Sequence, residues 1–270
     1  MIPIRIDDPD DPRIAAYRDI RERDLAGRQG LFIAEGKVVL NVLFAARRFE
    51  VDSILLLENR LAGMADTLAL APADAPLYVA SADVLDRIAG FHMHRGVLAV
   101  GRRGTPRPVN AVLEGLPADA LVLALVGISN HDNIGAIFRN AAAFGADAIL
   151  LDATCCDPLY RKAIRVSVGA ALKTPFATAP DAQALIKALS AHDFTQIALS
   201  PAGSQEISDL RGAGRVAVFL GAEGPGLPDD ILDTLTSVRI RMAAGFDSLN
   251  VAAASAIALH HFAQERWKKI

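Results

Sequence analysis

The second half of the sequence alternates short apolar runs with helical patterns, and this alternation constrains the fold more than any other feature. The spacing predicts strands at Leu121–Val126, Ala148–Leu151, Ile197–Leu199, Val216–Leu220 and Val238–Ile240. It predicts helices at Ile134–Phe144, Tyr160–Val168, Asp181–Ala191, Asp229–Thr234 and from Ser248 to about Trp267. Such alternation is typical of a parallel sheet covered on both faces. Because ligands of these sheets bind beyond the carboxyl ends of the strands, chemistry is expected in the loops after Val126, Leu199, Leu220 and Ile240.

The first part of the chain predicts a smaller α/β unit. Strands are expected at Leu31–Ala34, Val51–Leu57 and Gly96–Val100, and helices at Arg13–Ala26, Gly36–Ala46 and Ser81–Ala89. Glycine and proline cluster over Gly101–Pro117, which marks a linker. The length of 270 residues suits one large domain or two small ones. We therefore expect an N-terminal domain over residues 1–108 and a C-terminal domain over residues 109–270.

Composition excludes several classes of protein. With 52% hydrophobic and 22% charged residues, the chain can bury a sizeable core and is not intrinsically disordered. No apolar run is long enough to cross a bilayer and no signal peptide opens the chain, so we expect a cytoplasmic protein without a membrane partner. The adjacent pair Cys155 and Cys156 predicts neither a disulfide framework nor a metal site, and buried thiols are the simpler interpretation.

A polar loop follows the first strand of the second part. It runs from Gly127 to Asn133 and leads into the helix that carries Arg139. Asn133 is a candidate cap for that helix, and Arg139 is expected near the carboxyl end of the strand. An ordinary capped helix with an exposed arginine is the alternative. Neither a dinucleotide-binding Gly-x-Gly-x-x-Gly run nor a Gly-Lys-Ser/Thr phosphate loop is present, which argues against those nucleotide sites.

Two further loops carry polar or glycine-rich patterns. Gly221–Pro228 holds three glycines and two prolines directly after a strand, which is more than a tight turn requires. Ile240–Asn250 joins the last strand to an alanine-rich helix and places Ser248 and Asn250 at its start. Ser248 is the candidate N-cap, whereas capping explains Asn250 less readily.

Taken in order, these loops resemble the motifs of the SpoU, or TrmH-like, family of RNA ribose 2′-O-methyltransferases in the SPOUT superfamily. The resemblance is strong over about residues 120–265. Its first motif is matched by Asn133, Gly135, Ile137, Arg139 and Ala141; its second by Gly221–Gly226; its third by Ile240, Met242 and Ser248–Val251. The stretch from Cys156 to Ala170 is also similar to the family. Departures stand at Arg241, Ala252 and Asn140, where the family usually has proline, serine, and threonine or serine.

The resemblance implies an enzyme that transfers a methyl group from S-adenosylmethionine to a ribose 2′-hydroxyl. It implies a parallel-sheet C-terminal domain with a deep trefoil knot, formed by about residues 195–265. The expected cofactor-binding residues are Leu220, Gly221, Gly224, Ile240, Met242, Leu249 and Asn250. The expected catalytic residues are Arg139, Asn133, Glu223, Ser248 and Asn250. Because a free arginine stays protonated, Arg139 is expected to bind the target phosphate and stabilise the developing alkoxide rather than act as a simple base.

The N-terminal part resembles the substrate-binding domain of the same family through Phe32, Glu35 and Gly36. The net charge of −3 does not by itself indicate a nucleic-acid-binding protein, but arginines are locally clustered. Arg47, Arg48, Arg102 and Arg103 are the candidate RNA-binding residues, with solvated surface charge as the alternative interpretation. By resemblance, the two-domain layout favours ribosomal RNA over transfer RNA, and the protein is expected to form a homodimer through its C-terminal domain.

Four alternative functions remain to be separated from this one. A transfer-RNA 2′-O-methyltransferase shares every motif named above. A base methyltransferase of the same superfamily is disfavoured by the pairing of Asn133 with Arg139. A non-catalytic RNA-binding or ribosome-assembly protein is disfavoured because the matched polar positions are intact. A nicotinamide dehydrogenase is disfavoured because its glycine fingerprint is missing.

Overall fold

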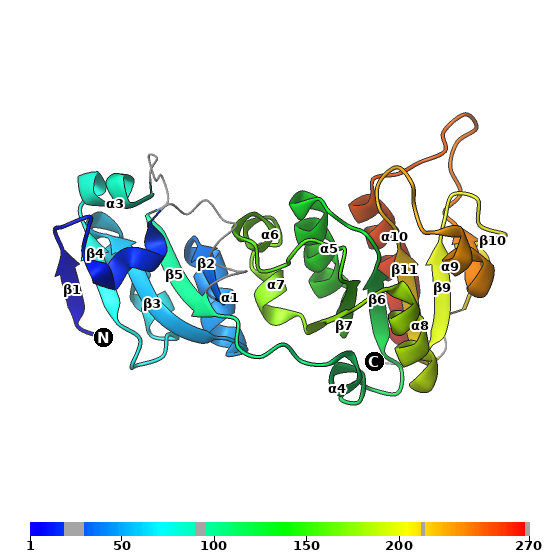
Figure 1. Ribbon diagram of the computed structural model, residues 1–270, viewed down its shortest axis with the longest axis horizontal. Coiled ribbons are helices and arrows are strands. Elements are labelled where there is room, and N and C mark those ends of the chain that lie inside the picture. The colour runs from blue at the N-terminus through cyan, green and yellow to red at the C-terminus, as the bar shows by residue number, and fades with distance from the viewer. Residues whose placement is uncertain (19–29, 90–95, 212–213, 268–270) are drawn as a thin grey trace. The chain divides into compact units, whose positions relative to one another are not determined.

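The computed structural model describes residues 1–18, 30–89, 96–211 and 214–267, and they form two compact units (Figure 1). The first unit contains Met1–Thr105 together with Pro158–Lys173, and the second contains Pro106–Asp157 and Thr174–Ile270. The structure therefore differs from the expected division at residue 108, because the segment Pro158–Lys173 packs with the N-terminal unit. Among the described residues, no helix combines the length and the apolar character needed to span a membrane.

The second unit is built on a seven-stranded parallel sheet in the order β10-β12-β9-β11-β6-β7-β8. Its strands are β6 (Leu121–Leu125), β7 (Ala148–Asp152), β8 (Phe176–Ala179), β9 (Thr195–Leu199), β10 (Gln205–Glu206), β11 (Val216–Leu220) and β12 (Thr236–Arg239). The parallel sheet and the strands expected from the apolar runs are confirmed. The short strands β8 and β10 were not expected from the sequence.

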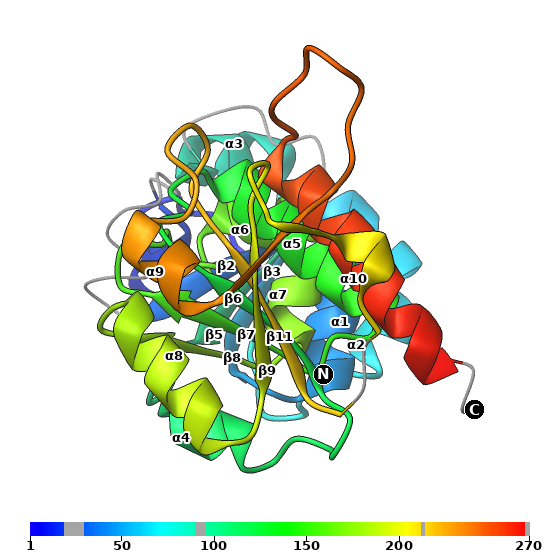
Figure 2. The same ribbon diagram turned by 90° about the vertical axis from the view of Figure 1, so that its right-hand side faces the viewer.

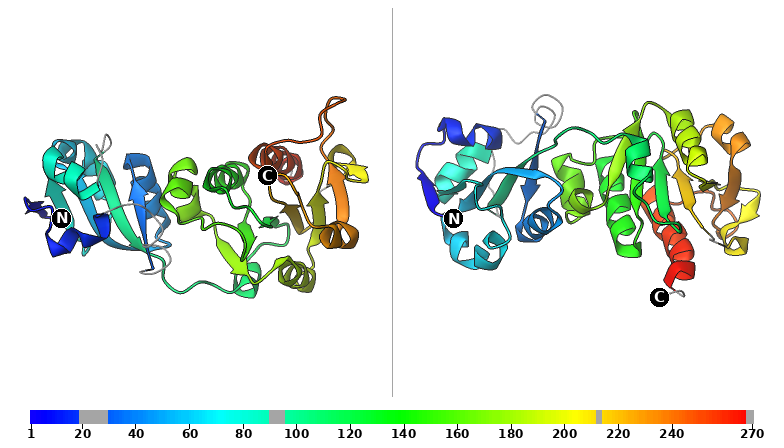
Figure 3. Two further views of the ribbon diagram at one scale, coloured as in Figure 1. Left: turned by 45° about the horizontal axis from the view of Figure 1, so that its top comes forward. Right: turned by 90° about the horizontal axis from the view of Figure 1, so that it is seen from below.

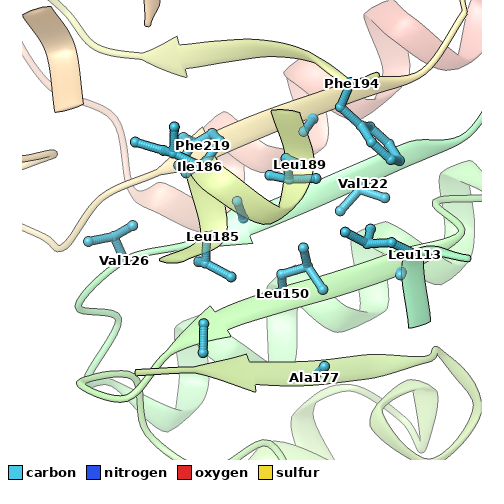
Figure 4. Packing of buried hydrophobic residues seen from close by; sticks show 14 of the residues in the cluster. Leu113, Val122, Val126, Leu150, Ala177, Leu185, Ile186, Leu189, Phe194 and Phe219 are labelled. Atoms are coloured by element: carbon cyan, nitrogen blue, oxygen red, sulfur yellow. The ribbon is translucent and has the colours of Figure 1, made fainter. Parts of the chain in front are cut away.

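Helices cover both faces of this sheet (Figure 2). They are α4 (Val109–Leu113), α5 (His131–Phe144), α8 (Ala182–Ala191), α9 (Asp229–Thr234) and α10 (Val251–Trp267), with a short 3-10 helix at Ile207–Asp209. On one face, Leu185 and Leu189 of α8 pack with Val122, Leu150 and Phe219 of the sheet (Figure 4). Each of these side chains is fully buried. Burying an aliphatic or aromatic side chain of this size contributes about 2 kcal/mol, so the core holds the strand ends in a fixed register.

The opposite face of the sheet is covered by α5 and α10, which lie side by side (Figure 2, Figure 3). Ile134, Ile137, Phe138 and Ala141 of α5 are fully buried, as their helical spacing predicts. Asn140, one of the departures from the family pattern, joins the two helices. Its Nδ2 donates to the Ala252 carbonyl oxygen at 2.7 Å and to Ser255 Oγ at 3.0 Å.

The first unit contains a five-stranded mixed sheet in the order β1-β4-β3-β5-β2. Its strands are β1 (Pro3–Ile6), β2 (Leu31–Glu35), β3 (Glu50–Leu57), β4 (Leu77–Ala80) and β5 (Val97–Arg102). The expected strands correspond to β2, β3 and β5, whereas β1 and β4 were not expected. Strand β5 is antiparallel to both β2 and β3, and the other pairs are parallel.

Short helices flank this sheet. They are η1 (Pro12–Tyr17), α1 (Lys37–Ala46), η3 (Glu58–Met64), α2 (Ala65–Leu68), α3 (Ala82–Ala89), α6 (Arg161–Val166) and α7 (Ala170–Lys173). The helix expected over Arg13–Ala26 is represented by η1, while residues 19–29 lie outside the described residues. Tyr17 of η1 is fully buried, and its hydroxyl is 2.9 Å from Ser53 Oγ. Burial raises the pKa of Tyr17 well above its usual value.

A buried ion pair explains why Pro158–Lys173 belongs to the first unit. Glu35, at the end of β2, accepts hydrogen bonds from Arg161 Nε at 3.1 Å and from Arg161 Nη2 at 2.7 Å. The two side chains are only 8% and 14% exposed. Behind them, Gly169 has φ of +84° and lies so close to α1 that an added Cβ would reach Val42 Cβ at 3.0 Å. Glu35, expected as part of an RNA-binding signature, thus forms a structural contact.

Replacing Arg161 by methionine (Arg161→Met) leaves the Glu35 carboxylate buried without its partner. We expect the free energy of unfolding to fall by about 3 kcal/mol, because an uncompensated buried charge is strongly destabilising. Urea unfolding followed by circular dichroism measures this change. Asp7→Ala is the control, since it removes an exposed ion pair with Arg5 and should leave the unfolding midpoint unchanged. Equal midpoints for the two variants would contradict the structural role of the buried pair.

Candidate functional site

The loops after β9, β11 and β12 enclose a cavity of about 650 Å³ at the carboxyl ends of the strands. Parallel strands end at the same edge of their sheet, so loops far apart in the sequence meet there. The loops after Leu199, Leu220 and Ile240, which the sequence singled out, all contribute to its wall. All the expected cofactor-binding residues line it: Leu220, Gly221, Gly224, Ile240, Met242, Leu249 and Asn250.

Asn250 is the centre of the polar wall of this cavity. Its Nδ2 donates to Glu223 Oε1 at 2.8 Å and to Asn133 Oδ1 at 3.0 Å. Its Oδ1 accepts from the backbone N–H groups of Ala252 at 2.9 Å and Ala253 at 3.3 Å. One amide side chain therefore joins the loop after β11, the first turn of α5 and the start of α10. The structure brings together three of the expected catalytic residues, namely Asn133, Glu223 and Asn250.

The predictions that Asn133 caps α5 and that Ser248 caps α10 are both wrong, and the structure shows why. Helix α5 begins at His131, and its N-cap is Asn130, whose Oδ1 accepts from the Asp132 N–H at 2.8 Å. Asn133 instead lies buried within the first turn, at 6% exposure, where it accepts from Asn250. Helix α10 begins at Val251 and is capped by Asn250, not by Ser248. Ser248 is exposed and lines the cavity.

The glycines of the loop after β11 let two backbone segments approach closely. A Cβ at Gly221 would overlap the backbone of Gly226 and Leu227. Gly224 and Gly226 adopt φ of +87° and +74°, a region that side chains disfavour. The loop is closed by a hydrogen bond from the Gly226 N–H to the Ala222 carbonyl at 3.0 Å. Bare peptide groups consequently form this wall of the cavity.

Sequence reasoning missed Asp152, which shapes the loop before α5. This carboxylate is 5% exposed and lies at the end of β7. It accepts from the N–H groups of Gly127 at 3.1 Å and Cys155 at 3.0 Å, and from Thr154 Oγ1 at 2.8 Å. The only sequence signal was a polar residue directly after an apolar strand. Asp152 fixes the backbone that leads to Asn130 and thus to the start of α5.

The cysteine pair has a structural place in the same loop. Cys155 Sγ accepts from the Ile128 N–H at 3.3 Å and lies 3.4 Å from the Leu125 carbonyl oxygen. Burial raises the pKa of the Cys155 thiol to about 12 and that of Cys156 to about 11. Both thiols therefore stay protonated near neutral pH, which makes them poor nucleophiles.

Arg139 does not line the cavity of its own chain. It is exposed on α5, two turns beyond the buried Asn133. Near it on the same helix, Ala142 and Ala143 are also exposed. Its position near the carboxyl end of β6, expected from the sequence, does not place its side chain in the site.

The four expected RNA-binding arginines have different surroundings in the first unit. Arg102 forms ion pairs with Glu50 and Asp52, so internal carboxylates compensate its charge. Arg103 is partly buried, and this burial lowers its pKa. Arg47 is exposed at the end of α1, and the Arg48 guanidinium lies 5.0 Å from the centre of the Phe49 ring. Arg47 and Arg48 are therefore better placed than Arg102 to contact phosphate.

Comparison with known proteins gives the same family as the motifs. The model of the SpoU rRNA Methylase family matches residues 120–260. An uncharacterised tRNA/rRNA methyltransferase of Mycobacterium tuberculosis is 41% identical over 263 residues, covering 94% of this chain and 89% of that protein. The chain belongs to the SpoU rRNA methylase family, which is a family of RNA methyltransferases.

Solved structures share the fold over nearly the whole chain. An S-adenosylmethionine-bound rRNA methyltransferase from Sinorhizobium meliloti has a TM-score of 0.81 at 22% identity and covers 98% of both chains. An RNA 2′-O ribose methyltransferase has a TM-score of 0.79 at 25% identity and covers 98% of this chain and all of the other. The α/β fold with a parallel sheet is thus one that known methyltransferases adopt.

Gly221→Ala tests the close approach of the loop backbones. Because the added Cβ has no space beside Gly226, we expect the loop to shift and the affinity for S-adenosylmethionine to fall by at least tenfold. Isothermal titration calorimetry measures the affinity. Gly115→Ala is the matched control, since its Cβ would meet only the Val112 carbonyl at 3.8 Å. Unchanged affinity in Gly221→Ala would contradict the assigned role of this loop.

Asn250→Asp separates the helix cap from the wall of the cavity. The new side chain keeps an oxygen for the N–H groups at the start of α10 but loses both Nδ2 donors and places a carboxylate beside Glu223. We expect a stable fold by thermal unfolding and at least tenfold weaker binding of S-adenosylmethionine, because like charges repel and the loop is released. Wild-type affinity in this variant would show that the network does not organise the cavity.

Proposed function

We propose that this protein transfers a methyl group from S-adenosylmethionine to a ribose 2′-hydroxyl of RNA, with ribosomal RNA as the substrate. The observation that carries the proposal is the network in which Asn250 joins Glu223 and Asn133 at the wall of the glycine-lined cavity. Membership of the SpoU family and the S-adenosylmethionine-bound neighbour support the choice of cofactor. The proposal includes a cytoplasmic location for this activity.

The residues that line the cavity fit S-adenosylmethionine. A volume of about 650 Å³ lies within the range of small-molecule sites. The bare backbone around Gly221 offers peptide groups to a flat adenine ring, and Ile240 and Leu249 supply apolar walls. Glu223 and Asp247 place negative charge at the same cavity, which suits a positively charged ligand. When bound, the cofactor supplies a methyl group on a sulfonium centre.

The side chains of the chain itself meet the demands of ribose methylation. A ribose hydroxyl is a poor nucleophile near neutral pH, so its oxygen must be positioned closely and its developing charge stabilised. In the proposal, Ser248 at the cavity wall orients the ribose, while the amide of Asn250, whose donors and acceptor are already engaged, holds the surrounding loops in place. Glu223 and Asn133 each accept a hydrogen bond from Asn250 and so keep its side chain in place. In the proposal these two act as positioning residues. Arg139 binds the target phosphate and stabilises the alkoxide, and the proton leaves through that phosphate.

The proposal includes a homodimer and a trefoil knot in the second unit. The knot would be formed by about residues 195–265 and would hold the loops after β11 and β12 in place. The exposed surfaces of α5 and α10 support the dimer, because they carry apolar side chains as well as Arg139. These include Ala142, Ala143, Ile257 and Trp267, of which Ile257 is 41% and Trp267 48% exposed. A second copy seated on this surface would bury them and bring its own Arg139 toward the cavity.

Transfer of labelled methyl groups tests the substrate class. Purified protein is incubated with tritium-labelled S-adenosylmethionine and either ribosomal RNA or transfer RNA, and label in each RNA pool is counted. Label in ribosomal RNA alone is the expected result. Label in transfer RNA alone would favour the alternative, a transfer-RNA 2′-O-methyltransferase, which the name of the mycobacterial relative also allows. Cofactor binding without transfer to either RNA would contradict the proposal and favour a non-catalytic RNA-binding protein.

Arg139→Ala tests the role of the exposed arginine. We expect methyl transfer to fall by at least a hundredfold while the affinity for S-adenosylmethionine stays unchanged, because Arg139 lies outside the cavity that would hold the cofactor. Arg87→Ala, on the exposed surface of α3, is the control and should keep full activity. Weaker cofactor binding in Arg139→Ala would instead identify Arg139 as a structural residue.

Mixing two inactive variants tests whether Arg139 acts from a second subunit. Arg139→Ala and Asn250→Asp are each expected to be inactive alone. In a mixed dimer, one of the two sites combines an intact cavity with the partner's intact arginine. Activity restored on mixing is expected, whereas two inactive variants that stay inactive in a verified mixed dimer would contradict action between subunits.

A further inference from the structure

The first unit contains a cavity of about 510 Å³ that the proposed methyl transfer does not use. It lies between the carboxyl end of α1, the start of β3 and the loop that follows α2. Its walls combine apolar and aromatic side chains with basic and acidic ones, among them Arg47, Arg48, Phe49, Glu50 and Asp74. A packing void in a hydrophobic core would have apolar walls only, unlike this cavity. Its volume is large enough for a nucleotide.

A fixed planar surface forms one wall of the cavity. The guanidinium of Arg48 lies over the Phe49 ring, with its carbon 5.0 Å from the ring centre. Arg48 Nη1 is also 3.5 Å from the Ala171 carbonyl oxygen of α7. The Phe49 ring packs edge-to-face on Phe32, at 5.1 Å between centres. Phe32 is buried against Gly101, where a Cβ would overlap its ring. The stacked pair is thus held from both sides.

Charge at the cavity fits a nucleotide better than a free anion. Arg47 is exposed and adopts φ of +49°, a left-handed conformation that glycine normally supplies after a helix. Beside α1, the segment Pro158–Lys173 contributes four basic residues and no acidic one, and of these Arg161 is already paired with Glu35. Phosphate would find positive charge here. Glu50 and Asp74 would repel a bare anion, yet their carboxylates accept hydrogen bonds from the exocyclic amino group of a base.

We propose that this cavity binds one unpaired nucleotide of the RNA, with its base stacked on the guanidinium plane of Arg48 and its phosphate at Arg47. Sequence-selective proteins commonly stack unpaired RNA bases on aromatic rings and guanidinium planes. The inference deepens the proposed function, on which it rests for the identity of the ligand as RNA. It assigns to the first unit the recognition of a single-stranded position in the substrate.

The test compares binding of two RNA probes to the full-length protein. One is a fluorescent octamer of cytidines, and the other is the same strand with abasic central nucleotides. Fluorescence anisotropy gives both affinities for the wild type, Phe49→Leu and Arg48→Lys. These variants keep apolar bulk or positive charge and remove one planar group each. Arg87→Lys on α3 is the matched control, since Arg87 is exposed in the same unit and outside the cavity.

The wild type and the control are expected to bind the cytidine octamer about tenfold more tightly than the abasic one, because a stacked base contributes about that factor. In Phe49→Leu and Arg48→Lys the ratio should fall to about one while affinity for the abasic strand is kept. A ratio that survives in both variants would overturn the proposal. Binding is measured without methyl transfer, so its outcome is independent of whether the proposed reaction occurs.

Discussion

The amide of Asn250 is the contact on which the site depends. Only a side chain with both donors and an acceptor on one carbon can bind two side-chain oxygens and cap a helix at once. Here the donors meet Glu223 and Asn133, and the acceptor meets the first N–H groups of α10. The start of α10, the glycine loop after β11 and the first turn of α5 are thereby fixed to one another. The cavity takes its shape from these three segments.

The sheet explains why segments more than 100 residues apart meet at this point. All strands of the second unit are parallel, so their carboxyl ends share one edge, and buried aliphatic side chains hold their register. The first unit is stabilised separately, with the Glu35–Arg161 pair fastening α6 to the end of β2. Cofactor-binding and nucleotide-binding surfaces can therefore belong to different units of one chain, each formed on its own core.

The sequence predicted those helices and strands whose apolar residues recur with a simple period. Apolar runs located the central strands, and the loops that follow them located the cavity. The choice between neighbouring residues of the same kind was harder to predict. Asn130 and Asn133 lie within one turn, and only tertiary contacts decide which of them caps α5. Short strands such as β8 and β10 carry too few residues for a clear pattern. The place of Pro158–Lys173 depends on a contact between residues 126 positions apart, which periodicity does not encode.

The position of the transferred methyl group tests the central claim most directly. After reaction of the protein with labelled S-adenosylmethionine and ribosomal RNA, the RNA is digested to nucleosides and analysed by mass spectrometry. The account predicts label in a 2′-O-methylnucleoside, with the mass increase on the ribose fragment. Label on the base fragment would contradict it, because the roles proposed for Ser248 and Arg139 require a ribose hydroxyl as the acceptor.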